Sequence, residues 1–295
     1  MDKYARMDFR DQISKNKYKS IFLMIIIFVI FVVLGYVISM AFAPGYFFVI
    51  MIFSIIFSIS YILISYYNSD KIAVASVGAK PASREKHKQF YDSVEGLTLA
   101  SGLPMPKLYV MNSPQINAFA SGRNPKNAVV CVTTGALEKL DKSELEGVIA
   151  HELGHISNYD IRYMTLTAVM VGMVAIISEI FLRSLWFKSS DDNSKGNAIF
   201  ILIGIALAIL APIVVYLVQM AISRKREYVA DASSVQFTRY PPGLIKALKK
   251  IQKENAVPEK KVSKAIAPLF FANPFKNIGS THPPIEERIK VLEKM

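Results

Sequence analysis

Cysteine is nearly absent from this chain, since Cys131 is the only one in 295 residues. A single thiol excludes an intramolecular disulfide framework and every cysteine-rich zinc module. The polar part of the chain therefore needs no oxidising compartment. Any metal site must be built from histidine and carboxylate side chains, and the sequence holds only four histidines.

Charged residues are also scarce, at 20% of the chain against 52% hydrophobic residues, and the mean hydropathy is +0.32. Between Lys19 and Asp70 there are 50 consecutive residues without a formal charge. A disordered chain and a purely soluble chain are both excluded, because such a run is typical of membrane spans.

The uncharged run predicts two transmembrane helices, Ile21–Ala43 and Tyr46–Tyr67, with a tight hairpin at Pro44-Gly45. Each helix exceeds the roughly 20 residues that cross the hydrocarbon of a bilayer. A secretory signal peptide is an alternative for the first segment, because Ala41-Phe42-Ala43 resembles a cleavage site. The length of the apolar core, Pro44 after the site and the second span all favour a retained helix.

A second pair of spans is predicted at Tyr163–Leu182 and Ala198–Ala221, joined by a loop over residues 183–197. The second of these lies in 28 uncharged residues from Gly196 to Ser223. The first is weaker because Glu179 interrupts it, so a buried or partly embedded helix is the alternative there.

Basic residues flank the apolar segments, with net charges of +3 over residues 1–19 and +8 over residues 224–295. The positive-inside rule places such flanks in the cytoplasm, so both termini and the polar regions are expected there. The charge also favours contact with anionic lipid of the bilayer. No nucleic-acid recognition motif accompanies it, and we expect no nucleic acid as a partner.

The polar segments predict a small mixed α/β part in a mainly helical membrane protein. Strand-like runs stand at Lys107–Met111, Asn117–Ser121 and Ala128–Thr133, and helices are expected at Arg84–Ala100, Ser143–Tyr159, Arg224–Arg239 and Leu244–Asn255. Ser143 and Glu146 have the spacing of a capping box. Four parts follow: a tail and hairpin (1–69), a first polar half (70–162), a second membrane pair (163–223) and a second polar half (224–295).

The chemistry-bearing motif is His151-Glu152-Leu153-Gly154-His155, inside one of the expected helices. Histidines four residues apart share a helix face, so both imidazoles can bind one ion. Glu152 lies beside that face, where it can take a proton from water next to the ion. The pattern indicates a zinc-dependent hydrolase.

Catalytic zinc usually has three protein ligands, so a third must be found. Glu227 is a better candidate than the remaining histidines, His87 and His282. Asp231 falls one helical turn later on the same face, where it could accept the free ring N–H of a ligating histidine. A solvated acidic pair on a helix surface is the alternative for these two carboxylates.

Taken in order, these residues resemble the HtpX-type proteases, membrane-embedded zinc endopeptidases of the gluzincin class, which includes the prenyl-protein proteases. The similarity covers nearly the whole chain: a hairpin of two spans, Asn117-Ala118-Phe119, the zinc motif, two more spans, Glu227 through Asp231, and Thr281-His282-Pro283-Pro284 before Arg288. The resemblance implies one zinc ion held by His151, His155 and Glu227, with Glu152 as base, in a zincin-like domain beside four transmembrane helices. It also implies a prokaryotic plasma-membrane enzyme that cleaves damaged or misfolded membrane proteins and unfolded polypeptides.

Three further sites depend partly on this resemblance. His282 either donates a hydrogen bond to the oxyanion of the tetrahedral intermediate or only begins a helix before the prolines. Arg288 pairs with Asp231 or a substrate carbonyl, unless it forms an ordinary surface ion pair. Asn117, Ala118 and Phe119 begin either an edge strand that pairs with substrate backbone or a plain sheet strand.

Two other functions compete with this interpretation. A prenyl-protein protease would need a larger membrane chamber than four short spans enclose. A transporter or structural membrane protein, with no catalysis, would use polar residues in the spans instead.

Overall fold

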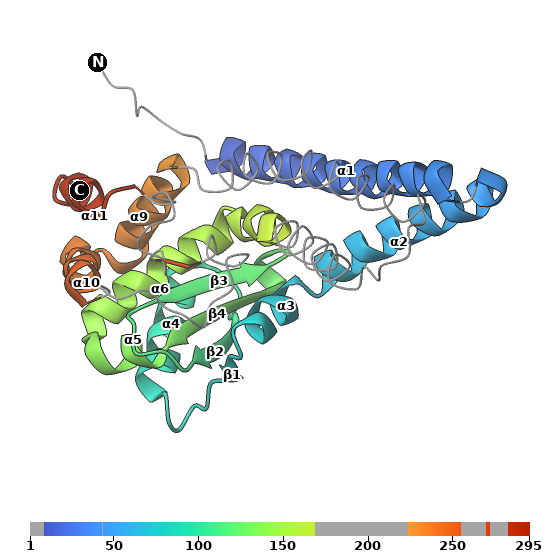
Figure 1. The fold of residues 1–295 in the computed structure, drawn as a ribbon. Coiled ribbons are helices and arrows are strands. Elements are labelled where there is room, and N and C mark those ends of the chain that lie inside the picture. The colour runs from blue at the N-terminus through green and yellow to red at the C-terminus, as the bar shows by residue number, and fades with distance from the viewer. Residues whose placement is uncertain (1–8, 43, 169–223, 255–269, 272–282) are drawn as a thin grey trace, which may run out of the picture.

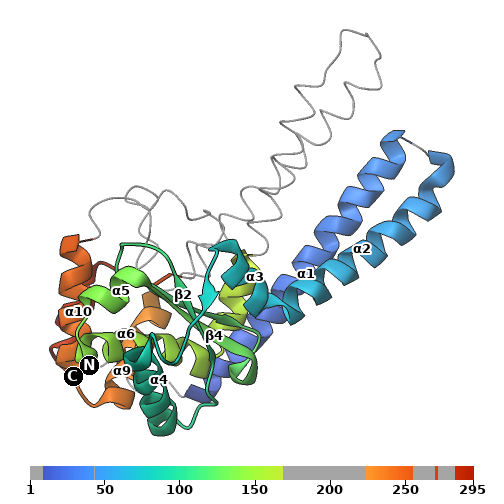
Figure 2. The ribbon, with the colours of Figure 1, turned by 90° about the horizontal axis from the view of Figure 1, so that it is seen from below.

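The long apolar runs near the N-terminus form two helices, α1 (Phe9–Phe42) and α2 (Phe47–Tyr67), joined by the short helical turn η1 (Pro44–Tyr46). The computed structural model describes residues 9–42, 44–168, 224–254, 270–271 and 283–295. Within these residues, α1 and α2 lie antiparallel and project away from the mixed α/β part (Figures 1 and 2). The predicted helical hairpin is confirmed.

The hairpin buries little of its apolar surface against protein. Segments Ile13–Val33 and Phe47–Tyr67 are long and apolar enough to cross a membrane, and only 28% and 6% of their most apolar windows are buried. Phe31 packs edge-on against Phe57 and Tyr61, which holds the two helices together. Large side chains such as Phe48 and Phe53 stay exposed, as is expected for a surface that contacts lipid.

The second predicted pair of spans falls mostly within residues 169–223, outside the described residues. Of these segments only 163–168 is described, as the end of a buried helical stretch that begins at Asp160. The expected count of four spans therefore stays a prediction.

A four-stranded sheet forms the centre of the polar part. It contains β1 (Lys80–Pro81), β2 (Lys107–Met111), β3 (Ala118–Gly122) and β4 (Ala128–Thr133), in the order β1-β2-β4-β3. β2 and β4 are parallel, whereas the other neighbouring pairs are antiparallel. β3 is therefore an edge strand of this sheet.

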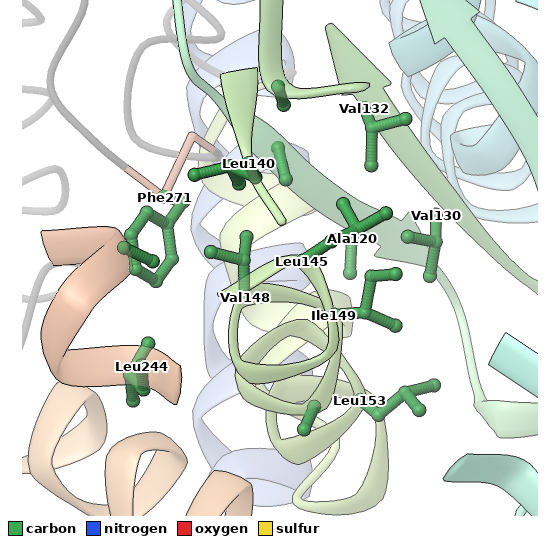
Figure 3. Close-up of a cluster of buried hydrophobic side chains, with 14 of the residues drawn as sticks. Ala120, Val130, Val132, Leu140, Leu145, Val148, Ile149, Leu153, Leu244 and Phe271 are labelled. Atoms are coloured by element: carbon green, nitrogen blue, oxygen red, sulfur yellow. The ribbon is translucent and has the colours of Figure 1, made fainter. Parts of the chain in front are cut away.

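Helix α6 (Lys142–Ser157) lies across the sheet and is surrounded by α4 (Lys88–Ser101), α9 (Arg224–Thr238) and α10 (Pro241–Glu254). Shorter helices in the described part include α3 (Ser69–Ser76), α5 (Thr134–Lys139), α11 (Ile285–Leu292) and the short helical turn η2 (Pro125–Asn127). Figure 3 shows apolar side chains of the sheet and of α6 in one buried cluster, which Leu244 and Phe271 complete.

Two glycines let neighbouring helices approach α6 closely. A Cβ at Gly154 would lie 2.9 Å from Ser233 Cβ and 3.2 Å from Ala230 Cα, both on α9. A Cβ at Gly147 would lie 2.6 Å from the backbone nitrogen of Leu244 on α10. The absence of a side chain at Gly154 lets α9 pack directly against the part of α6 that carries the zinc motif, and Gly147 does the same for α10 one or two turns earlier.

Several predicted boundaries are wrong by one turn or less. The capping box of α6 is formed by Asp141 and Glu144 rather than by Ser143 and Glu146, so the helix begins earlier than expected. Helix α4 begins at Lys88, after a turn, rather than at Arg84. The prolines at 241 and 242 begin α10 instead of only breaking the chain, because a missing N–H costs nothing in a first helical turn.

Candidate metal centre

Helix α6 buries all three polar residues of its zinc motif. His151, Glu152 and His155 expose 0%, 1% and 4% of their surface. Nε2 of His151 lies 3.7 Å from Glu227 Oε2, and Nε2 of His155 lies 3.5 Å from Glu227 Oε1. His151, His155 and Glu227 each offer one ligand atom, and these atoms lie within 4.8 Å of one another. Helices α6 and α9 therefore bring the expected ligand set together.

Each histidine is held from behind by a carboxylate. Nδ1 of His151 lies 2.9 Å from Asp231 Oδ1, and Nδ1 of His155 lies 3.1 Å from Asp160 Oδ2. A carboxylate accepts hydrogen bonds, so each Nδ1 carries a proton and each Nε2 faces Glu227. With Nδ1 occupied in this way, Nε2 is the ring nitrogen that would bind a metal ion once it carries no proton.

The donor set fits a divalent cation with a preference for imidazole nitrogen. His151 Nε2 is buried and makes no hydrogen bond to the described residues. Two imidazoles and one carboxylate suit zinc and are a poor set for magnesium or calcium, which prefer oxygen ligands alone.

Asp231 and Arg288 form a buried ion pair behind His151. Arg288 donates from Nε to Asp231 Oδ2 at 2.9 Å and from a terminal nitrogen to Oδ1 at 2.6 Å. Another terminal nitrogen lies 3.6 Å from Glu227 Oε2. With only 1% of its surface exposed, Arg288 does not form the surface ion pair that was one alternative from sequence.

Burial controls the protonation of Glu152 and His151. It raises the pKa of Glu152 to about 7, with Glu227 adding to the rise and His155 opposing it. Burial also lowers the pKa of His151 to about 4. The nearby charge of Arg288 adds to this decrease, whereas the hydrogen bond to Asp231 opposes it. A neutral His151 and a carboxyl that titrates near neutrality suit a ligand and a general base.

His155 behaves differently because two carboxylates face it. Burial lowers its pKa, but the hydrogen bonds to Asp160 and Glu227 raise it more, to about 10. In the absence of a cation, a proton on His155 balances these charges. A metal ion takes the place of that proton, because an imidazole binds metal only in its neutral form.

The expected substrate strand is an edge strand, and part of its edge is already paired. Ala118 accepts a hydrogen bond through its carbonyl oxygen from Phe271 N at 2.8 Å. Phe119 forms an antiparallel bridge with Phe270, and their rings lie 5.2 Å apart. Asn117 lies just before β3, where its side-chain oxygen accepts from Ala118 N at 3.0 Å.

His282 lies outside the described residues. Two residues near the site were not found from sequence. Asp160 follows the second histidine by five positions, beyond the end of α6, so helical spacing did not point to it. Phe271 packs against both His151 and Arg288: its ring centre lies 4.8 Å from the centre of the imidazole and 4.8 Å from the guanidinium carbon. Its acidic side chain just after the motif was the only signal for Asp160, and no pattern in the sequence pointed to Phe271.

The chain is similar to known proteins both in sequence and in fold. The model of Peptidase family M48 matches residues 84–295. A "Protease HtpX homolog" of Caldanaerobacter subterraneus subsp. tengcongensis is 47% identical over 86% of this chain and 90% of its own length. Another, from Dictyoglomus thermophilum, is 42% identical over 97% of this chain and 95% of its own length.

Among solved structures, the crystal structure of S. mikatae Ste24p is similar in fold. The TM-score is 0.52 at 21% sequence identity, over 96% of this chain and 67% of that one. At this identity the likeness concerns the fold alone.

Proposed function

This chain belongs to peptidase family M48 and is a membrane zinc metalloprotease, and on that premise we propose how its own residues carry out the reaction. His151, His155 and Glu227 hold one zinc ion, and Glu152 is the general base. The observation that carries the proposal is the convergence of both Nε2 atoms on the Glu227 carboxylate, each imidazole being fixed from behind by another carboxylate.

A zinc ion held by His151, His155 and Glu227 would supply Lewis-acid chemistry, which polarises the scissile carbonyl and makes a neighbouring water molecule more acidic. Glu152 accepts the proton of that water, for which a pKa of about 7 suits it. The same carboxyl then gives the proton to the leaving amine. Peptide hydrolysis proceeds without a covalent intermediate, because no nucleophilic side chain is needed.

The edge of β3 binds the substrate in our proposal. Ala118 already pairs through its carbonyl with Phe271, so this edge accepts an extended segment. Ala120, two residues along the same edge, presents its backbone in the same direction, and its backbone N–H helps to lower the pKa of the Glu152 carboxyl. Substrate backbone that replaces Phe270 and Phe271 beside Asn117, Ala118 and Phe119 would thus pass the base.

Arg288 and His282 have different proposed roles. Arg288 keeps Asp231 ionised and in place behind His151, since both of its contacts to Asp231 are buried. His282 donates a hydrogen bond to the oxyanion of the tetrahedral intermediate, as the sequence resemblance implies.

The enzyme acts at the cytoplasmic face of a prokaryotic plasma membrane in our proposal, on membrane proteins and unfolded polypeptides. The basic flanks of the hairpin support this orientation. A prenyl-protein protease is a related alternative that nothing in the described structure favours. The transporter alternative is dropped, because the chain belongs to a peptidase family.

Metal content and casein hydrolysis by the full chain in detergent test this proposal. The wild type should contain one zinc per chain, lose hydrolysis on chelation and regain it with zinc. Glu152→Gln should keep the zinc yet lose at least 10²-fold in rate, the order that a general base contributes. His151→Ala and Glu227→Ala should lose stoichiometric zinc. Retention of metal by these two variants would contradict the ligand assignment, and hydrolysis by Glu152→Gln would contradict the base.

A further inference from the structure

The carboxylate behind His155 has a second partner that comes from the membrane hairpin. Asp160 accepts from His155 Nδ1 through Oδ2 at 3.1 Å, and from Asn16 Nδ2 through Oδ1 at 2.6 Å. Asn16 lies on α1, before the uncharged run that begins after Lys19, and outside the family match over residues 84–295. A short hydrogen-bonded relay thus joins the first membrane helix to a proposed zinc ligand.

Asn16 also holds the turn that carries Asp160. The same nitrogen, Nδ2, donates to the backbone carbonyl of Asn158 at 2.9 Å, so both of its protons are used. Tyr159, between the two acceptors, has a φ of 58°, a left-handed conformation that non-glycine residues rarely adopt. Lys17, next to Asn16, lies 4.7 Å from the centre of the Tyr159 ring.

These contacts are shielded from water. Asn16 exposes 1% of its surface, and Asn158 and Asp160 expose none. Among the described residues, Asn16 is the only hydrogen-bond donor to Asp160 Oδ1. A buried carboxylate oxygen without a donor is costly, so the amide fixes the orientation of the carboxylate and, through it, that of the imidazole.

We propose that Asn16 is a positioning residue of the metal centre, acting through Asp160 to hold the Nε2 of His155 toward the ion. The proposal rests on the ligand set of the proposed function. It makes the start of the first membrane helix a part of the metal centre, so displacement of α1 from the turn at 158–160 loosens the metal.

Zinc affinity of the full-length protein in detergent, measured by competition with a chromogenic chelator, tests this role. Asn16→Leu keeps much of the side-chain volume and removes both donors. We expect it to weaken zinc binding by about 3- to 10-fold. Loss of a residue that hydrogen-bonds a metal ligand directly weakens binding by roughly 10- to 100-fold, and Asn16 acts one step further away. Asn16→Ala serves as the second variant if Asn16→Leu fails to fold.

Ser20→Ala is the matched control, because Ser20 is buried one turn later on α1 and donates only to the Asn16 carbonyl. Its zinc affinity should stay at the wild-type value. The visible absorption of the Co²⁺-substituted protein adds a readout of ligand geometry. The spectrum should change in Asn16→Leu and not in Ser20→Ala. A general loss of stability would affect both variants alike.

A double-mutant cycle shows whether Asn16 acts through Asp160. In an Asp160→Asn background, Asn16→Leu should weaken zinc binding by less than it does in the wild type. Wild-type affinity and an unchanged Co²⁺ spectrum in Asn16→Leu, or full additivity with Asp160→Asn, would overturn the inference. Failure of the wild type to bind zinc, or retention of zinc by His155→Ala, would instead overturn the proposed function.

Discussion

At the scale of single residues, the metal centre contains buried charges, each of which is compensated by a partner of opposite charge. Asp231 and Arg288 expose 0% and 1% of their surfaces and bind each other through two hydrogen bonds. The positive Arg288 helps to lower the pKa of Asp231 although burial alone would raise it. Removal of one partner leaves an uncompensated charge in a dry environment.

Asp231→Ala is therefore expected to act on both metal binding and folding. Zinc affinity should fall by roughly 10- to 100-fold, because His151 loses the acceptor of its Nδ1 proton. Stability should fall by about 3–5 kcal/mol, because Arg288 stays buried without its partner. Chelator competition and thermal unfolding measure the two effects.

Asp92→Ala is the control for that variant, since Asp92 is an exposed carboxylate on α4. It should change neither quantity. Unchanged zinc affinity in Asp231→Ala would show that Asp231 does not orient His151.

The sequence predicts which side chains share a helix face when helical spacing links them. His151 and His155 share a face of α6, and Glu227 and Asp231 share a face of α9, so each pair was predictable from a period of 3.6. Asp160 depends on the turn at Tyr159, and Asn16 depends on contact between parts of the chain about 140 residues apart. Neither relation leaves a periodic pattern in the sequence.

At the scale of elements, the start of α6 matters because that helix carries three residues of the site. Asp141 accepts from Glu144 N at 2.9 Å, while Glu144 Oε2 accepts from Asp141 N at 2.8 Å. The Glu144 hydrogen bond outweighs the effect of burial and lowers the pKa of Asp141. Ser143 only donates to Asp141 Oδ1, at 2.8 Å.

Loss of this cap should destabilise the protein by about 1 kcal/mol in Asp141→Ala, whereas Ser143→Ala should cost a few tenths at most. The cap is an ionised carboxylate with a lowered folded-state pKa. Its contribution is therefore present above the unfolded value of about 3.9 and is lost as the pH falls through the folded value. Thermal unfolding of both variants at pH 7 measures the difference. Equal destabilisation would mean that Ser143 caps the helix, as its spacing to Glu146 had suggested.

The strands β2, β3 and β4 were predictable to within one residue because each is a short apolar run between turn residues, whereas the exposed two-residue strand β1 was not predicted. Lys107–Met111 and Ala128–Thr133 were predicted with the bounds that β2 and β4 have. The pairing order was not predictable, since it depends on which strands meet in space. That β3 is an edge strand follows from this order.

At the scale of the whole molecule, both ends of the hairpin contact the α/β part. Asn16 near the start of α1 bonds to Asn158, and Arg123 of the α/β part donates to the Tyr67 carbonyl at the end of α2. If the hairpin spans the bilayer, the metal centre and both helix ends lie on one side and the tip at Pro44–Tyr46 lies on the other. Basic residues flank the two ends and not the tip, so the positive-inside rule predicts that the metal centre faces the cytoplasm.

Thiol labelling of intact cells tests this orientation. A cysteine at the hairpin tip, Tyr46→Cys, should react with an impermeant reagent added outside, since Tyr46 is 67% exposed. Glu85→Cys, at an exposed position before α4, should react only after permeabilisation. The wild type is the control, because Cys131 is buried and burial raises the pKa of its thiol well above its usual value. Labelling of Glu85→Cys from outside without labelling of Tyr46→Cys would reverse the topology.

The two helices that meet at the metal centre are far apart along the chain, and this spacing has a consequence for biosynthesis. With the ligand set proposed here, the two histidines are translated first, and 71 residues separate His155 from Glu227. At about 5–20 residues per second, roughly 4–14 s pass before the ribosome reaches the third ligand. During that interval the growing chain carries both imidazoles and the general base but not the carboxylate that completes the site. The order of synthesis therefore keeps the protease inert beside nascent polypeptides, its own included, until α9 has been made.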